Sequence, residues 1–130
     1  MRSMRTLLLA ILFLTGLAVT GCTGGIPSPD PLPAGKTFGG TWDSNWGQVV
    51  LIQKGTHVSG QYKGFRNGSV SGDLDGNVFI FKWTQRESQQ WGRGYLKMKP
   101  DGNALEGRWG YKKNYTNGGR WWANRAQYLE

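Results

Sequence analysis

Apolar and polar residues alternate over short stretches from Phe38 onward, and no window in this region has the spacing of an amphipathic helix. A period of two is typical of strands that bury one face. Turn signals such as Asn67-Gly68 and Asp75-Gly76 interrupt the alternation. The pattern predicts eight short strands, which cover residues 40–42, 48–54, 57–63, 69–74, 77–85, 94–99, 104–112 and 119–125.

The predicted strands are joined by short connections, with longer loops at residues 86–92 and 113–118. Short connections favour antiparallel hairpins between consecutive strands. Strands of this number and length fit an all-β fold, and closing them into an up-and-down barrel removes the exposed edges of an open sheet. We therefore expect a small antiparallel β-barrel over residues 38–130.

A weak internal repeat supports the barrel. The form aliphatic-x-Gly-x-large apolar recurs at residues 58–62, 70–74 and 105–109. Alternation places its aliphatic, glycine and large residues on one face, and a glycine in a strand permits the close backbone approach that a small barrel requires. The large residues are therefore expected to fill the core, together with the tryptophans at strand positions, which are Trp42, Trp83, Trp109 and Trp121.

The first residues of the chain have the composition of an export signal. Arg2 and Arg5 precede an apolar run from Leu7 to Val19, which is shorter than the roughly 20 residues of a membrane-spanning helix. The run ends in Val19-Thr20-Gly21-Cys22, which resembles the lipobox of bacterial lipoproteins. The alternative is a plain signal peptide with a chance cysteine near the cleavage site.

The lipobox resemblance implies a chemical fate for Cys22, the one cysteine of the chain. In that family the chain is cut before the cysteine, which carries lipid on its sulfur. Residues 1–21 are then a lipoprotein signal peptide, and the protein is anchored in the bacterial cell envelope. The family's inner-membrane retention signal is an Asp at the next position, so Thr23 implies the outer membrane, facing the periplasm or the cell surface.

Residues 22–37 hold four of the five prolines and several glycines. Such a segment is expected to be a semi-extended tether between the lipidated cysteine and the barrel. At the polyproline rise of about 3.1 Å per residue it would reach roughly 40 Å.

The chain carries a net charge of +8, which favours anionic partners such as lipid head groups and acidic glycans. An exported lipoprotein rarely meets nucleic acid, so that partner is not expected. The most closely spaced basic residues are a candidate patch, formed by Lys97, Lys99, Arg108, Lys112 and Lys113. The sequence leaves the oligomeric state open.

The stretch from Gly40 to Gly47, followed by Val58-Ser59-Gly60-Gln61-Tyr62, resembles the opening of avidin-like barrels, and similar Gly-x-Trp openings recur in lipocalin-like barrels. The resemblance implies a ligand-binding barrel. The family's biotin-contacting Asn and Ser fall on Ser44 and Gln48, whereas Tyr62 matches a family contact. Two of the three polar contacts therefore differ, which argues against biotin as the ligand.

Catalytic motifs are not apparent in the sequence. His57 is the single histidine, and the sequence nominates neither a nucleophile nor an orienting acid beside it. It also has no second histidine or cysteine with which to bind a metal. No phosphate-binding loop, dinucleotide fingerprint or nucleophile elbow occurs. We therefore expect no enzyme activity, no cofactor and no metal site.

The remaining functional signal is aromatic. Trp46 and Trp91 lie in or beside predicted turns, and Trp122 follows Trp121 in a strand, so one of that pair must face outward. With Tyr62, these residues are the candidates for ligand contact, namely Trp46, Tyr62, Trp91 and Trp122. Exposed aromatic rings stack on sugars and other flat ligands.

These features suggest an anchored, non-catalytic binding module for a small amphipathic ligand, a glycan or an anionic envelope component. The alternative is a scaffold for protein interaction, such as an envelope assembly factor or an inhibitor of an exported enzyme. A tryptophan-lined cavity favours ligand binding. A barrel filled by its own side chains, among them Phe79, Phe81, Trp83, Leu96 and Trp109, favours the scaffold.

Overall fold

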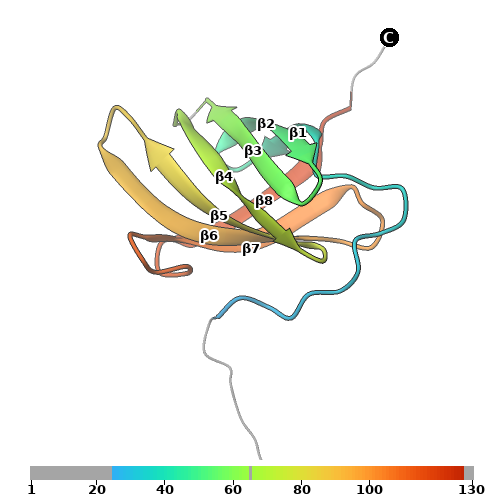
Figure 1. Ribbon diagram of the computed structural model, residues 1–130. Helices are drawn as coiled ribbons and strands as arrows, with labels where there is room; N and C mark the ends of the chain where they lie inside the picture. Colours follow the sequence, from blue (N-terminus) through green and yellow to red (C-terminus); the bar gives the residue numbers. More distant parts are fainter. Residues whose placement is uncertain (1–24, 65, 128–130) are drawn as a thin grey trace, which may run out of the picture.

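Eight strands follow one another around a closed antiparallel barrel in the computed structural model, which describes residues 25–64 and 66–127 (Figure 1). The barrel closes because β1 pairs with β8 through Trp42 opposite Arg125 and Ser44 opposite Ala123. The predicted all-β barrel is confirmed. The strands are β1 (Gly40–Ser44), β2 (Gly47–Lys54), β3 (His57–Lys63), β4 (Gly68–Asp75), β5 (Val78–Gln85), β6 (Gln90–Met98), β7 (Ala104–Tyr111) and β8 (Gly119–Arg125).

The largest difference from the sequence prediction concerns β6, which begins at Gln90 rather than Gly94. The hairpin with β5 continues without interruption from Val78 opposite Lys97 to Gln85 opposite Gln90. Gly92 does not end the strand because it lies beneath the indole of Trp83, where a Cβ would be 2.7 Å from Nε1. The connection is therefore four residues, 86–89, and Trp91 belongs to a strand rather than to a loop.

The interior of the barrel is filled by side chains from alternate strand positions. Trp42, Trp83 and Trp121 are at most 1% exposed, and Trp109 is partly buried against them. Buried aliphatic and phenyl side chains fill the remaining space, among them Phe79, Phe81, Leu96, Leu105 and Val58. The four tryptophans predicted for the core therefore lie in or against it.

Glycines in the strands permit close contact between neighbouring backbones. A Cβ on Gly72 would lie 1.9 Å from the carbonyl oxygen of Ile80, and one on Gly107 would lie 1.8 Å from that of Tyr95. No side chain fits at such distances, so these positions require glycine. Both glycines belong to the repeat found in the sequence, which therefore marks where the sheet bends.

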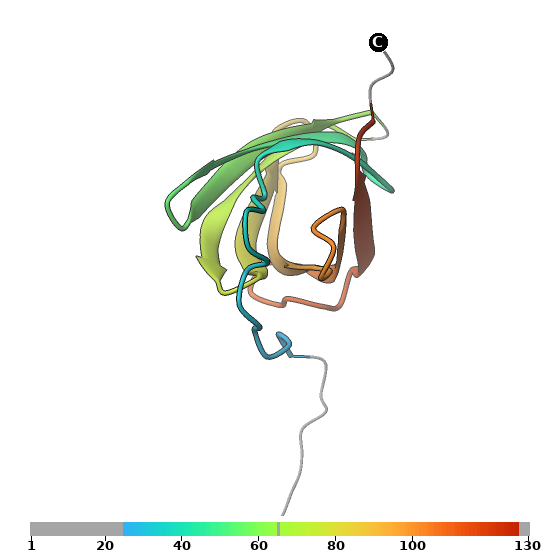
Figure 2. The same ribbon diagram turned by 90° about the vertical axis from the view of Figure 1, so that its right-hand side faces the viewer.

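The segment that precedes β1 runs across part of one end of the barrel (Figure 2) and contributes Phe38 to the core. Phe38 is fully buried, with its ring centroid 5.9 Å from that of Phe79. The guanidinium of Arg125 lies 4.2 Å from the Trp42 ring and donates hydrogen bonds to the carbonyls of Thr37, Gly39 and Gly102. Arg125 thus ties this segment and the β6–β7 turn to the barrel.

Part of the proline-rich segment is fixed on the barrel wall. The ammonium of Lys97 donates to the Ser28 carbonyl at 2.8 Å and lies 3.0 Å from the Asp30 carboxylate. The Asn77 side chain accepts a hydrogen bond from the Asp30 amide. These contacts hold residues 28 and 30 against the barrel, so the segment from residue 28 onward is not free to extend over the roughly 40 Å expected for the whole tether. The predicted signal peptide and Cys22 lie outside the described residues, and the tether role stays a prediction.

Candidate functional site

The barrel end opposite the Phe38 segment is surrounded by four strand connections, and we call it the mouth. It is formed by the connections β1–β2, β3–β4, β5–β6 and β7–β8, because these odd-to-even turns all lie at the same end of an up-and-down barrel. Residues far apart in the sequence therefore converge here, which the linear pattern alone did not reveal.

Trp46 is the side chain that closes the floor of the mouth. It lies in the short β1–β2 turn, where the hydroxyl of Ser44 donates to the Gly47 carbonyl and accepts from the Trp46 amide. Gly47 has a φ of 101° and packs on the Lys63 carbonyl, which leaves the turn little freedom. The turn directs the indole inward, and Trp46 is only 6% exposed.

The Trp46 ring is the centre of an aromatic cluster. It stacks on Trp121 at 4.2 Å with an interplanar angle of 16°, and it meets Tyr62 edge-on at 4.9 Å. Trp109 and Trp83 contact it edge-on at 5.2 and 6.0 Å. Such pairs contribute about 0.5–1.5 kcal/mol each beyond the burial of their area. The floor is therefore rigid and apolar.

A cavity of about 270 Å³ lies above this floor. Its apolar surface comes from Trp46, Trp83 and Trp109, and Gly118 allows the β7–β8 connection to lie directly on the Trp109 indole, where a Cβ would be 2.3 Å from the ring. Its polar lining comes from four residues, which are Asn45, Arg66, Gln85 and Arg120.

Two of the polar side chains are engaged in holding the wall. Asn45 accepts from the Trp122 amide and donates to the Arg120 carbonyl, both at 2.9 Å. Gln85 donates to the Tyr62 hydroxyl at 3.0 Å and accepts from Ser88. The positive charge of the cavity comes from Arg66, whose charge also acts on the buried Tyr62. Arg120 contributes its backbone carbonyl, because its side chain is at an outward position of β8 next to the buried Trp121. The arrangement combines flat apolar rings with one cation.

Tyr62 is fully buried beneath the cavity. Burial raises the pKa of its hydroxyl above the ordinary value of 10.0, while the hydrogen bond from Gln85 and the charge of Arg66 act in the opposite direction. The hydroxyl is therefore neutral at physiological pH. It serves as the hydrogen-bond partner that allows the Gln85 amide to be buried.

The raised pKa of Tyr62 predicts a loss of stability in alkali. The unfolded chain ionises this hydroxyl at a lower pH than the folded protein does. The contribution of Tyr62 to the free energy of unfolding is therefore complete below the pKa of the unfolded chain, and it is lost as pH rises through the pKa of the folded protein. Above about pH 10, we expect the free energy of unfolding to fall less steeply in Tyr62→Phe than in the parent. Urea denaturation across this range measures both slopes. Tyr111→Phe, at an exposed mouth tyrosine, is the control; slopes that coincide in parent and Tyr62→Phe would contradict the assignment.

The four aromatic candidates from the sequence do not form one site. Trp46 and Tyr62 contact each other inside the barrel. Trp91 lies on the outer wall of β6 with the Lys82 ammonium 4.9 Å from its ring, and Trp122 is 44% exposed on β8. Their roles in ligand contact stay predictions, and the structure gives Trp46 alone a place in the cavity lining.

The predicted basic patch is divided between two places. Lys97, Lys99 and Arg108 line a groove on the outer wall of β6 and β7. Lys112 and Lys113 belong to the β7–β8 connection at the mouth. Lys99 is paired with Glu106 at 2.8 Å. The sequence missed Arg66, Arg120, Trp83 and Trp109 as cavity residues, because only the common end of their strands brings them together.

The positions that correspond to biotin contacts in avidin-like barrels do not converge. The Ser44 hydroxyl is engaged in the β1–β2 turn, and Gln48 is exposed on β2 while Tyr62 is buried inside.

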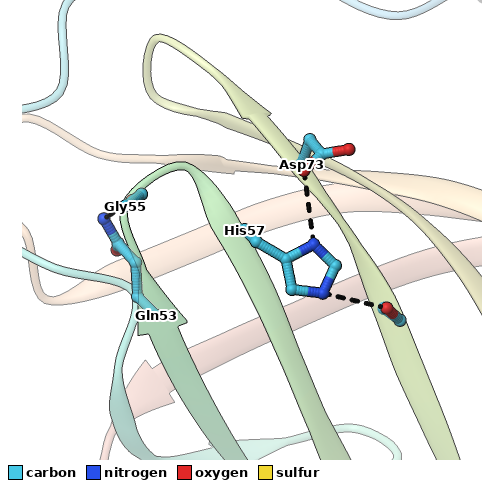
Figure 3. A network of polar contacts seen from close by, with 5 residues as sticks. Gln53, Gly55, His57 and Asp73 are labelled. Carbon is cyan, nitrogen blue, oxygen red and sulfur yellow. Dashed lines mark hydrogen bonds and ion pairs between the residues drawn. The ribbon is translucent and has the colours of Figure 1, made fainter.

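A network that the sequence did not reveal lies on the outer wall of β3 and β4 (Figure 3). The Nδ1 atom of His57 is 3.3 Å from the Asp73 carboxylate, and Nε2 is 3.3 Å from the Ser71 hydroxyl. The β3–β4 register brings these groups together, since His57 lies opposite Asp73. A serine, a histidine and an aspartate in contact in this order are also the groups of a nucleophilic catalytic triad.

The surroundings of this network differ from those of a hydrolytic site. The His57 and Asp73 side chains are 53% and 76% exposed. An oxyanion hole needs backbone amides that are free to donate hydrogen bonds toward one point. The amides of β3 and β4 are used in pairing, because each of these strands is paired with a neighbouring strand on both sides. The three groups therefore form an exposed polar network on a sheet surface. Among residues 25–64 and 66–127, no three His, Cys, Asp or Glu side chains are grouped to hold a metal ion, and no helix is long and apolar enough to cross a membrane.

In comparisons with known proteins, no family model matches the chain, and no curated protein or solved structure matches it significantly.

Proposed function

We propose that this protein is a lipid-anchored envelope protein whose barrel is a non-catalytic binding module, and that the mouth cavity is its ligand site. The observation that carries the proposal is the lining of that cavity, where three indoles, the cation Arg66 and polar groups of Asn45 and Gln85 surround about 270 Å³. Binding sites typically combine apolar walls with a few polar groups that fix the ligand's orientation. The mouth has this composition.

The lining indicates the chemical class of the ligand. The indoles of Trp46, Trp83 and Trp109 favour a ligand with a sugar or aromatic ring, and Arg66 favours a carboxylate or phosphate group on it. The volume is slightly below the range of about 300–1,000 Å³ for drug-sized ligands. A small ring-bearing anion fits these limits, such as an acidic monosaccharide or an aromatic acid.

The filled interior limits where a ligand can bind. Side chains from every strand occupy the space below Trp46, and Phe38 fills part of the other end. The ligand therefore lies on the floor of the mouth rather than inside the barrel. This favours a small, partly exposed ligand over a long acyl chain.

A titration of tryptophan fluorescence tests the ligand site, because Trp46 and Trp109 lie in its wall. Probes are glucuronate and indole-3-carboxylate, each compared with its neutral counterpart, glucose or indole. We expect saturable changes with the anions and affinities about tenfold lower for the neutral probes, equivalent to about 1.4 kcal/mol. Arg66→Gln should remove this preference, and Lys54→Gln at the other end of the barrel should not. Failure of every probe to give a saturable change would overturn the site.

The proposed anchor has separate support. The basic, apolar and lipobox-like segments follow one another in the order that lipoprotein export requires. Two or three acyl chains on one cysteine anchor a protein stably, whereas a single chain does not. Mass spectrometry of the protein extracted from membranes tests this proposal. An unmodified Cys22, or a chain that begins elsewhere, would overturn it.

A protein-interaction scaffold is the second candidate, and the filled barrel favours it. Phe79, Phe81, Trp83 and Leu96 are at most 3% exposed, so the interior serves stability. In that case the β5–β6 and β7–β8 connections at the mouth would contact the partner. Crosslinking in envelope extracts together with a negative probe titration would support this candidate.

A further inference from the structure

The outer wall of the barrel is divided into two halves of different charge. The outward positions of β5–β8 carry five cations and one carboxylate, which are Lys82, Arg93, Lys97, Arg108, Arg120 and Glu106. The outward positions of β1–β4 carry two lysines and three aspartates, which are Lys54, Lys63, Asp43, Asp73 and Asp75. The positive charge of the strands is therefore concentrated on one wall, which we call the basic wall.

The cross-strand register brings the groups of the basic wall side by side. Tyr95 lies opposite Arg108, and Arg108 lies opposite Arg120, so one row crosses β6, β7 and β8. Lys82 lies opposite Arg93 in the next row. Aromatic side chains are interleaved with these cations, and Trp122 is 44% exposed on β8. Basic and aromatic residues together are typical of surfaces that contact lipid head groups.

A groove of about 740 Å³ crosses the basic wall beside the proline-rich segment. Pro27, Pro31 and Pro33 form one side, and Lys97, Arg108 and Arg120 are among the residues that form the other. The groove is thus apolar on one side and carries more cations than carboxylates on the other, where Asp30 and Glu106 pair with Lys97 and Lys99. This is the complementarity that a phospholipid head group with the start of its acyl chains requires.

The course of the chain places this wall next to the proposed anchor. Residues 28 and 30 are held on the basic wall by Lys97. The chain between Cys22 and Ser28 spans at most about 20 Å when fully extended. An acylated Cys22 would therefore keep the basic wall within about 20 Å of the bilayer, so that a short approach brings its Lys and Arg residues into the range of about 8–10 Å over which surface charge acts.

We infer that the basic wall of β5–β8 docks on the anionic surface of the bilayer that holds the anchor, with the mouth directed along the membrane rather than away from it. This inference rests on the lipid anchoring proposed above. In this orientation the cations of the basic wall contact anionic lipid head groups, and β1–β4 face away from the bilayer.

Lysine labelling on vesicles tests the docking. The full lipid-modified protein is reconstituted in phosphatidylcholine vesicles with or without phosphatidylglycerol, treated with an amine-reactive reagent and analysed by mass spectrometry. Phosphatidylglycerol should slow the labelling of Lys82 and Lys97 about fivefold, the equivalent of about 1 kcal/mol per basic residue near an anionic surface. Lys54 and Lys63, on the opposite wall, are internal controls, and high salt should abolish the difference.

Charge reversal provides matched variants. Lys82→Glu with Arg120→Glu should remove the protection of Lys97, whereas Lys54→Glu with Lys63→Glu should leave it intact. Equal labelling of both walls in protein that floats with the vesicles would overturn the docking and leave the anchor standing. Protein that lacks lipid on Cys22 and does not float would overturn both. If soluble heparin slows the labelling of Lys82 and Lys97 but vesicles do not, the basic wall binds soluble polyanions, and the docking on the bilayer would also be overturned.

Discussion

Gly107→Ala is expected to lower the free energy of unfolding by about 3 kcal/mol or more, which is at the upper end of the range for overpacking a closed core. The added Cβ would lie 1.8 Å from the Tyr95 carbonyl oxygen and 3.0 Å from the Leu96 Cα. Both obstacles are backbone atoms of β6, which is paired with β5 and β7 and cannot move alone. Relief would require the two strands to separate.

Thermal unfolding followed by circular dichroism measures this effect. For a domain of this size, 3 kcal/mol corresponds to a fall in melting temperature of about 12–24 °C. Gly25→Ala makes the same chemical change where a Cβ would meet nothing within 4 Å, and it should shift the melting temperature little. A Gly107→Ala protein as stable as this control would show that β6 and β7 can separate at low cost.

The strands and the close-packed glycines of this barrel were predictable from the sequence for a physical reason. Alternation and turn residues act locally, so the eight strands could be located, and the repeat identified Gly72 and Gly107 as positions of close approach. The strand order also followed from locality, because each hairpin pairs strands that are adjacent in sequence, whereas closure depends on the pairing of β1 with the distant β8. The exception was the start of β6, where Gly92 was interpreted as part of a loop although it lies beneath Trp83.

The candidate site was less predictable because its residues meet only in three dimensions. Trp46 lies among polar residues in a turn, and its burial depends on the two hydrogen bonds of Ser44. Arg66 and Arg120 come from different hairpins, and their sequence positions carry no periodic signal of a shared cavity. The proline-rich segment had the composition of a free tether, but contacts with Lys97 and Asn77 fix part of it on the barrel.

Trp46→Ala is expected to have the second large effect, because it removes the floor of the mouth. Truncation of a buried Trp typically costs about 3–5 kcal/mol, and here Trp121 would lose its stacking partner. The probes that bind the mouth in the parent should lose their saturable fluorescence change. Trp122→Ala, the same truncation at a residue 44% exposed, should cost far less and leave probe binding intact.

Chemical rescue distinguishes loss of the floor from general unfolding. Engineered apolar cavities bind small aromatic molecules, so added indole should occupy the space left in Trp46→Ala and raise its melting temperature. Indole should raise the melting temperature of Trp46→Phe by a smaller amount, because the phenyl ring retains part of the stacking on Trp121. If indole stabilises the parent and Trp46→Ala equally, the space above Trp121 is not filled by Trp46. If Trp46→Ala is unfolded at all indole concentrations, Trp46→Phe still tests the site, because it should weaken probe binding while the barrel stays folded.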